Sequence, residues 1–150
     1  MSPAPVDASE GSYSAPLSPR PTVVTGYDEP AQRWQPGHRG VDLAAGPGQA
    51  VRAAGAGRVR FAGTVAGRPL VSVSHPDGVI TTYEPVEASV AAGDHVSRGE
   101  IIGTVISGHP GCPVVVCLHW GARRGSGRGA DYLDPLGLLG AVRVRLKPVG

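Results

Sequence analysis

The chain has 150 residues, of which fourteen are basic and twelve acidic, so its formal net charge is only +2. This length is typical of one domain that buries its own hydrophobic core. The basic residues are scattered along the sequence, which argues against a nucleic-acid partner. No apolar run reaches the length of a membrane-spanning segment.

The beginning of the chain, residues 1–21, is rich in Pro, Ser and Ala and poor in large apolar side chains. This composition predicts a flexible linker or tail. Residues 1–15 lack the apolar segment of a signal peptide. The expectation is therefore that the chain is cytoplasmic, that its export signal lies outside this sequence, or that its start is wrongly assigned. We expect a single domain over residues 22–150, with an extended lead-in and a core over residues 37–139.

Short apolar runs separated by Gly-rich turns fill the rest of the chain, a pattern typical of an all-β protein. The clearest element is a hairpin over residues 69–83, because its Pro-Asp-Gly turn combines residues that favour a tight bend. Residues 57–65 alternate, which predicts that Val59 and Phe61 share one face of a strand. Further strands are expected at residues 51–53, within 93–106, at 114–120 and at 142–146, with a short helical turn at 133–139.

His38 and Asp42 lie four residues apart where the foldable part of the chain begins. On a helix or on a strand this spacing places both side chains on one face. An imidazole and a carboxylate are two of the ligand types that zinc takes, and His119 supplies another imidazole inside an apolar run. Two His and one Asp, with no obvious fourth ligand, fit a zinc site that keeps one position open for water.

These residues belong to an ordered set of short motifs. The set comprises Gly37-His38-Arg39-Gly40-Val41-Asp42-Leu43, Ala50-Val51-Arg52-Ala53 with Gly57-Arg58-Val59, Ser74-His75-Pro76-Asp77-Gly78 with Thr82-Tyr83, Gly93-Asp94-His95-Val96 with Gly99-Glu100-Ile101-Ile102-Gly103, Leu118-His119-Trp120 and Asp134-Pro135-Leu136. In this order the motifs resemble the lysostaphin/LytM-type zinc endopeptidases, which cut peptide cross-bridges in bacterial peptidoglycan.

The resemblance implies a two-sheet β-sandwich of the duplicated hybrid motif type. It also implies zinc bound by His38, Asp42 and His119, and hydrolysis of cross-bridge or stem peptides of peptidoglycan in an extracytoplasmic or cell-wall location. No nucleic acid is expected as a partner.

Two positions depart from that family. Where it has histidines that orient the attacking water and stabilise the developing charge, this sequence has Pro85 and Cys117. The alternative function is therefore a catalytically degenerate member that binds peptidoglycan or regulates a partner cell-wall hydrolase. For an active enzyme, the general base would have to be His109, Tyr83, Glu84 or a water molecule. We favour His109, because its loop leads into the strand of His119 and an imidazole titrates near neutral pH.

Cys112 and Cys117 are the only cysteines, and the short loop between them can close into a disulfide if the chain turns at Pro113. A disulfide would suit an oxidising, extracytoplasmic environment. The alternative is a Cys117 thiolate ligand, since Cys117 and His119 would point to the same side of a strand and complete a closed, structural zinc site. We favour the disulfide.

The remaining histidines have simpler interpretations. His75 is expected at a turn or strand end, and His95 in a solvated segment. Residues 93–105 also resemble half of a lipoyl- or biotinyl-carrier domain. That chemistry needs a lysine presented on a hairpin, and the only lysine is Lys147, near the end of the chain, so we set this alternative aside.

Overall fold

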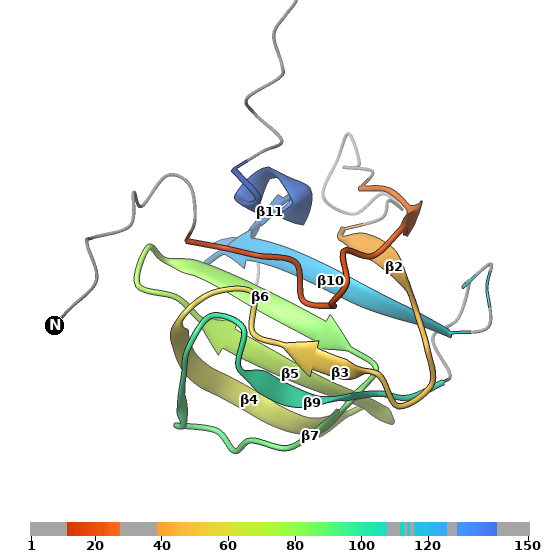
Figure 1. Cartoon of the computed structure of the whole chain (residues 1–150). Coiled ribbons are helices and arrows are strands. Elements are labelled where there is room, and N and C mark those ends of the chain that lie inside the picture. The colour runs from red at the N-terminus through yellow and green to blue at the C-terminus, as the bar shows by residue number, and fades with distance from the viewer. Residues whose placement is uncertain are drawn as a thin grey trace, which may run out of the picture.

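The computed structural model describes residues 12–27, 39–107, 112, 114, 116–125 and 129–140 (Figure 1). The predicted last strand at residues 142–146 lies outside these residues. No helix in the described part of the chain is long and apolar enough to span a membrane.

Eleven strands account for most of the described chain. Eight of them are β1 (Val23–Thr25), β2 (Val41–Ala45), β4 (Gly57–Val65), β5 (Arg68–Ser74), β6 (Val79–Glu84), β8 (His95–Val96), β10 (Val116–Arg124) and β11 (Asp131–Leu133). The other three are β3 (Ala50–Arg52), β7 (Val86–Ala88) and β9 (Ile101–Val105). A 3-10 helix, η2 (Pro135–Leu138), follows β11 where a helical turn was predicted.

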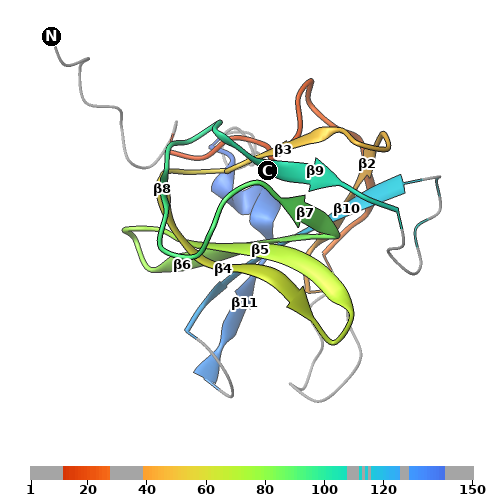
Figure 2. The ribbon, with the colours of Figure 1, turned by 90° about the horizontal axis from the view of Figure 1, so that it is seen from below.

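The strands form two antiparallel sheets. The larger sheet has the order β1-β2-β10-β6-β5-β4-β8, with β11 also paired to β10, and the smaller has the order β3-β9-β7. Figure 2 shows the smaller sheet lying over one face of the larger. The core between them is built from both sheets and includes Val51, Val71, Tyr83, Ile102, Leu118 and Trp120. The prediction of an all-β, two-sheet sandwich is confirmed.

The predicted hairpin is β5–β6, in which Val73 lies opposite Thr81. The turn between the strands closes when the His75 amide donates to the Val79 carbonyl over 2.9 Å. Gly78 has a φ of 90°, which is the left-handed region that glycine adopts without steric cost. The Pro-Asp-Gly sequence therefore predicted this element for the correct physical reason.

A β-bulge in β4 overturns the predicted alternation of that strand. Val59 lies opposite Val73 and Phe61 lies opposite Ser72, so Arg60 is an extra residue without a partner of its own in β5. An extra residue reverses the alternation of faces from that point on. Val59 is buried in the core whereas Phe61 faces away from it, so the prediction that they share a face is wrong.

The segment before β1 packs against the sandwich. The Ser14 amide donates to the Ala54 carbonyl and the Arg52 amide donates to the Pro16 carbonyl, both over 2.8 Å, so this segment covers the open edge of β3. Leu17 is 2% exposed and belongs to the core. The predicted flexible tail over residues 1–21 is therefore wrong for residues 12–21, because edge pairing and one well-placed leucine outweigh their composition. Residues 1–11 lie outside the described part.

His75 and Tyr83 belong to a buried chain of hydrogen bonds. The Ala54 amide donates to the Tyr83 hydroxyl over 3.0 Å, and that hydroxyl lies 2.7 Å from the Thr81 hydroxyl. His75 Nε2 lies 2.8 Å from Thr81 Oγ1, and His75 Nδ1 lies 2.9 Å from the Ala56 carbonyl oxygen. A carbonyl can only accept, so Nδ1 carries the proton and Nε2 accepts from Thr81. The neutral imidazole satisfies every partner.

Burial favours the neutral forms of His75 and Tyr83 in this chain of hydrogen bonds. Desolvation lowers the pKa of His75, although the hydrogen bond to Ala56 opposes the shift. Desolvation also raises the pKa of Tyr83 to about 12. His75 is thus a strand-end residue, as predicted, with a structural role in the core. His95 is exposed, also as predicted.

Replacing Leu17 with alanine should lower the free energy of unfolding by about 2–5 kcal/mol, because the change empties a buried volume in the core. Val23→Ala, at a side chain that is 39% exposed, is the control and should cost less than about 1 kcal/mol. Urea unfolding measures both. Equal, small losses in the two variants would show that residues 12–21 do not contribute to the core.

The free energy of unfolding should fall as the pH drops below about 6.5, the ordinary pKa of histidine. The unfolded state then binds a proton that His75 in the folded state does not accept, so stability falls by up to about 1.4 kcal/mol per pH unit. Above that pH the contribution is complete. His75→Gln should flatten the dependence between pH 7.5 and 5, whereas exposed His95→Gln should leave it unchanged. Identical pH profiles for the two variants would contradict the assignment.

Candidate functional site

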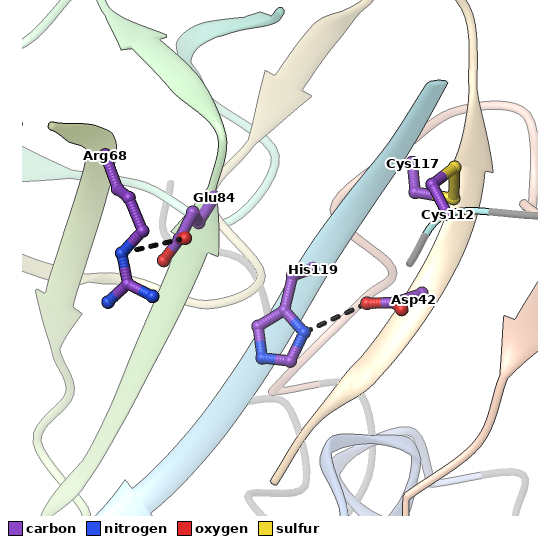
Figure 3. Close-up of polar contacts among 6 residues, drawn as sticks. All are labelled: Asp42, Arg68, Glu84, Cys112, Cys117 and His119. Atoms are coloured by element: carbon purple, nitrogen blue, oxygen red, sulfur yellow. Dashed lines mark hydrogen bonds and ion pairs between the residues drawn. A yellow bond between two sulfur atoms is a disulfide. The ribbon is translucent and has the colours of Figure 1, made fainter. Parts of the chain in front are cut away.

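Strands β2 and β10 bring two of the predicted zinc ligands together. Asp42 lies directly opposite His119 in the antiparallel register, and His119 Nδ1 lies 2.9 Å from Asp42 Oδ1. Figure 3 shows the two side chains converging from neighbouring strands. The Asp42 side chain is 5% exposed and that of His119 is 22% exposed, so the imidazole is the more accessible partner. The pair unites residues that are 77 positions apart in the sequence.

Gly40 allows the chain to enter β2 directly against the His119 imidazole. A Cβ atom at residue 40 would lie 2.6 Å from His119 Nε2 and 2.7 Å from the Trp120 carbonyl oxygen. Real Cβ atoms essentially never approach other atoms so closely, so any side chain here would displace the imidazole. The glycine in the His38-to-Asp42 motif is therefore required by the packing of the site.

The third predicted ligand, His38, lies outside the described residues. Among those that the structure describes, no group of three or more His, Cys, Asp or Glu side chains is placed to hold a metal ion. The donors that are described nevertheless fit zinc, since a carboxylate oxygen and an imidazole nitrogen already lie within hydrogen-bonding distance of each other. In the sequence His38 is two residues before Gly40, and it is Gly40 that lies against the imidazole.

His119 opens onto a cleft of about 670 Å³ on the larger sheet. Leu118 and Trp120, its neighbours in β10, are buried in the core, so His119 points to the opposite side. The cleft is lined by residues of β4, β5, β6, β10 and β11 and by Arg39, which precedes β2: Arg39, Arg60, Phe61, Val65, Arg68, Leu70, Ser72, Thr82, Glu84, His119, Gly121, Ala122, Arg123 and Tyr132.

Glu84 is the one carboxylate among the described residues that line this cleft. It lies on β6 directly opposite His119, so the side chains of these partners project from adjacent strands on one face. Its Oε2 atom lies 3.4 Å from Arg68 Nε, and its side chain is 13% exposed (Figure 3). The residue is therefore a partly buried carboxylate that an arginine holds beside the candidate metal ligand.

Tyr83, predicted as a candidate catalytic residue, is on the wrong face. It is fully buried and lies opposite Trp120, and its hydroxyl bonds to Thr81 and Ala54 in the core. Successive residues of a strand point to opposite faces, so Glu84 shares the face of His119 and Tyr83 cannot. That prediction is wrong. His109, the preferred candidate base, lies outside the described residues and stays a prediction.

Cys112 and Cys117 form the predicted disulfide, with a Cα–Cα distance of 5.7 Å. Cys117 lies two residues before His119 and opposite Ala44, so the disulfide is on the same face of β2 and β10 as the Asp42–His119 pair (Figure 3). A disulfide sulfur neither binds zinc as a thiolate nor takes a proton as a base. The disulfide therefore removes both of those roles from Cys117.

The arginines of the cleft were not singled out from the sequence. Arg123 could have been found, because it follows His119 by four residues on a strand and so shares its face. Simple alternation in residues 57–65 places Arg60 on the face opposite Val59, but the sequence does not show that this face of β4 borders the cleft of His119.

The sequence matches the family model described as Peptidase family M23 over residues 36–135. Uncharacterized proteins of Mycobacterium tuberculosis and Mycobacterium bovis are 53% identical over 146 residues, which cover 97% of this chain and 59% of each of those proteins. The chain thus spans about three fifths of the length of the curated relatives it matches.

Solved structures share the fold. The catalytic domain of the antimicrobial peptidase lysostaphin from Staphylococcus simulans is 25% identical, with a TM-score of 0.65 over 77% of this chain and 90% of that chain. A chain of the SpoIIIAH–SpoIIQ complex is 23% identical, with a TM-score of 0.70 over 85% of this chain and 99% of that chain. At this identity the second likeness concerns the fold alone.

Gly40→Ala should lower zinc affinity about tenfold or more, because the added methyl group displaces the His119 imidazole from its place beside Asp42. Gly46→Ala, at the other end of β2, is the matched control, since its Cβ would meet no atom closer than 3.9 Å. Competition with a zinc-binding dye measures both affinities. Unchanged affinity in Gly40→Ala would mean that His119 is not a ligand.

Proposed function

Because the chain belongs to peptidase family M23, we propose that it is a zinc-dependent endopeptidase domain that cleaves peptides of bacterial peptidoglycan. The observation that carries the proposal is the Asp42–His119 pair, which opens through His119 onto a cleft of about 670 Å³. A cleft of this size accommodates a short stretch of extended peptide. The likeness to the lysostaphin catalytic domain supports the same substrate class.

Zinc would be held by His38, Asp42 and His119, which leave one coordination position open. A zinc ion held there would supply Lewis-acid catalysis at the scissile peptide carbonyl. The protein's own contribution is orientation. Asp42 fixes the rotation of the His119 ring from the neighbouring strand, and Gly40 removes the side chain that would push that ring aside.

Glu84 is the described residue best placed to take a proton from the attacking water. It lines the cleft, lies opposite His119 and is oriented by Arg68. Pro85 has no group that titrates, and Cys117 is in a disulfide, so neither fills the role that histidines have in the family. His109, which precedes β10 in the sequence, is the second candidate.

The cell wall is the proposed place of action. The disulfide supports it, because such bonds persist in oxidising, extracytoplasmic compartments. The proposed substrate agrees with this location, since peptidoglycan peptides are extracytoplasmic.

A second candidate function is a non-catalytic domain that binds peptidoglycan or regulates a partner hydrolase. One observation favours it: the disulfide places a non-titrating group where the family has a helper histidine. The likeness to a chain of the SpoIIIAH–SpoIIQ complex shows only that this fold also occurs in a protein assembly. An open zinc site is chemically unnecessary for such a role, so we place the peptidase first.

Metal content and cleavage of wall peptides test the proposal. The wild type should bind one zinc ion and cleave, and His119→Ala should lose both properties. Glu84→Gln should keep its zinc while the cleavage rate falls about 10²–10⁴-fold, which is the usual loss on removing a positioned acid or base. Glu87→Gln, at an exposed glutamate of β7, is the control and should match the wild type.

Other outcomes assign the roles differently. Full activity in Glu84→Gln together with a large loss in His109→Ala would transfer the base to His109. A zinc-replete wild type that cleaves no peptidoglycan peptide would refute the peptidase and favour the non-catalytic function.

A further inference from the structure

The cleft beside His119 concentrates positive charge. Its described lining contains four guanidinium groups and one carboxylate, a formal surplus of three positive charges, whereas the whole chain carries only +2. Asp42 is absent from that lining, since its carboxylate is buried against His119. A cleft lined by one sign of charge focuses the field and raises the local concentration of ligands of the opposite sign.

Two of the four arginines already have partners in the cleft wall. The Arg68 Nε atom lies 3.4 Å from the Glu84 carboxylate, and the Arg39 guanidinium lies 4.8 Å from the centre of the Tyr132 ring. These contacts give Arg68 a role in positioning Glu84 and Arg39 a role in packing. Arg60 and Arg123 therefore contribute most of the surplus positive charge in the cleft.

No carboxylate among the described residues pairs with Arg60 or Arg123. Arg123 donates from Nε to the Gly125 carbonyl over 3.0 Å, which fixes the guanidinium plane and leaves its terminal nitrogens available. Arg60 is the extra residue of the β-bulge in β4, and it lines the cleft. Arg60 is exposed and Arg123 is partly exposed, so a ligand in the cleft can reach both guanidinium groups.

Ser72 is a second, independent sign of a ligand. It lies on β5, between the strands that carry Arg60 and Arg123, and it lines the cleft while only 6% exposed. Its hydroxyl has no hydrogen-bond partner among the described residues. A buried hydroxyl without a partner costs free energy that an acceptor on a bound ligand would offset. Hydrogen-bond donors therefore lie on both sides of the cleft, at Arg60 and Arg123, and between them at Ser72.

We propose that this cleft selects acidic peptides, with Arg60 and Arg123 binding peptide carboxylates from opposite walls and Ser72 donating from the floor. Three strand spacings, about 14 Å, separate β10 from β4, which leaves room for one extended chain between the two arginines. Guanidinium forks match carboxylates in geometry as well as in charge. The inference rests on the proposed function, whose substrate it narrows to peptides with free carboxylates.

Binding of matched peptides to the full chain tests the selectivity. The probes are a fluorescent peptidoglycan stem peptide with free carboxylates and the same peptide with each carboxylate amidated. At low salt the free acid should bind about tenfold more tightly, and added NaCl should erase most of that difference. Arg60→Gln and Arg123→Gln should each weaken binding of the free acid about three- to tenfold and leave the amide unaffected.

Two controls distinguish binding by these arginines from binding at the metal and from general charge attraction. Arg58→Gln, at an exposed arginine of β4 that does not line the cleft, should behave as the wild type. Protein treated with a chelator should keep its preference for the free acid. Loss of the preference for the free acid on chelation would mean that the peptide carboxylate binds at the metal site. If Arg58→Gln weakens binding as much as Arg60→Gln or Arg123→Gln, the preference is general charge attraction. Either result overturns the proposal.

Cleavage of the same two peptides distinguishes failure of this inference from failure of the proposed function. Selective binding without cleavage leaves the acidic-peptide site standing and refutes the peptidase. Cleavage of acid and amide with equal kcat/KM supports the peptidase and overturns the selectivity. Absence of binding by both peptides overturns the inference whatever the zinc content.

Discussion

The register of strand β10 is the constraint on which the site depends. This strand pairs with β2 along its first half and with β6 along its second, so His119 has Asp42 on one side and Glu84 on the other. The same register buries Leu118 and Trp120 completely. A slip of one residue would exchange the two faces, exposing Trp120 and burying His119, at a cost of several kcal/mol of apolar burial. Core packing therefore fixes the position of the polar site on the other face.

What the sequence could predict was local or chemically distinctive. The Pro-Asp-Gly turn specified the β5–β6 hairpin, and the two cysteines, close in sequence with a proline between them, specified their disulfide. Asp42 and His119 were found because imidazole and carboxylate are ligand types, and the fold then placed them 2.9 Å apart. The order of the motifs supplied the two-sheet architecture, which no single strand pattern contains.

The failures have a common cause, because each depends on pairing between distant segments. Tyr83 and Glu84 are adjacent in sequence, and only the register with β10 decides which of them faces the cleft. Leu17 looked like part of a polar tail because the uncovered edge of β3 cannot be seen from composition. Phe61 was predicted to share a face with Val59 by an alternation that the bulge at Arg60 interrupts. In each case the segment that decides the outcome is distant in the sequence, so a short stretch of sequence cannot reveal it.

The bulge also affects how the cleft can change over evolution. On either side of Arg60 the ladder between β4 and β5 is regular, with Val59 opposite Val73 and Phe61 opposite Ser72. Loss of a single codon at residue 60 would leave those pairs in place and restore an unbroken strand. Arg60 is thus an extra residue that the β4–β5 ladder accommodates without a change in those pairs. A lineage could gain or discard this cation, and with it the proposed contact to acidic peptides, without a change in β2 and β10, the strands of Asp42 and His119.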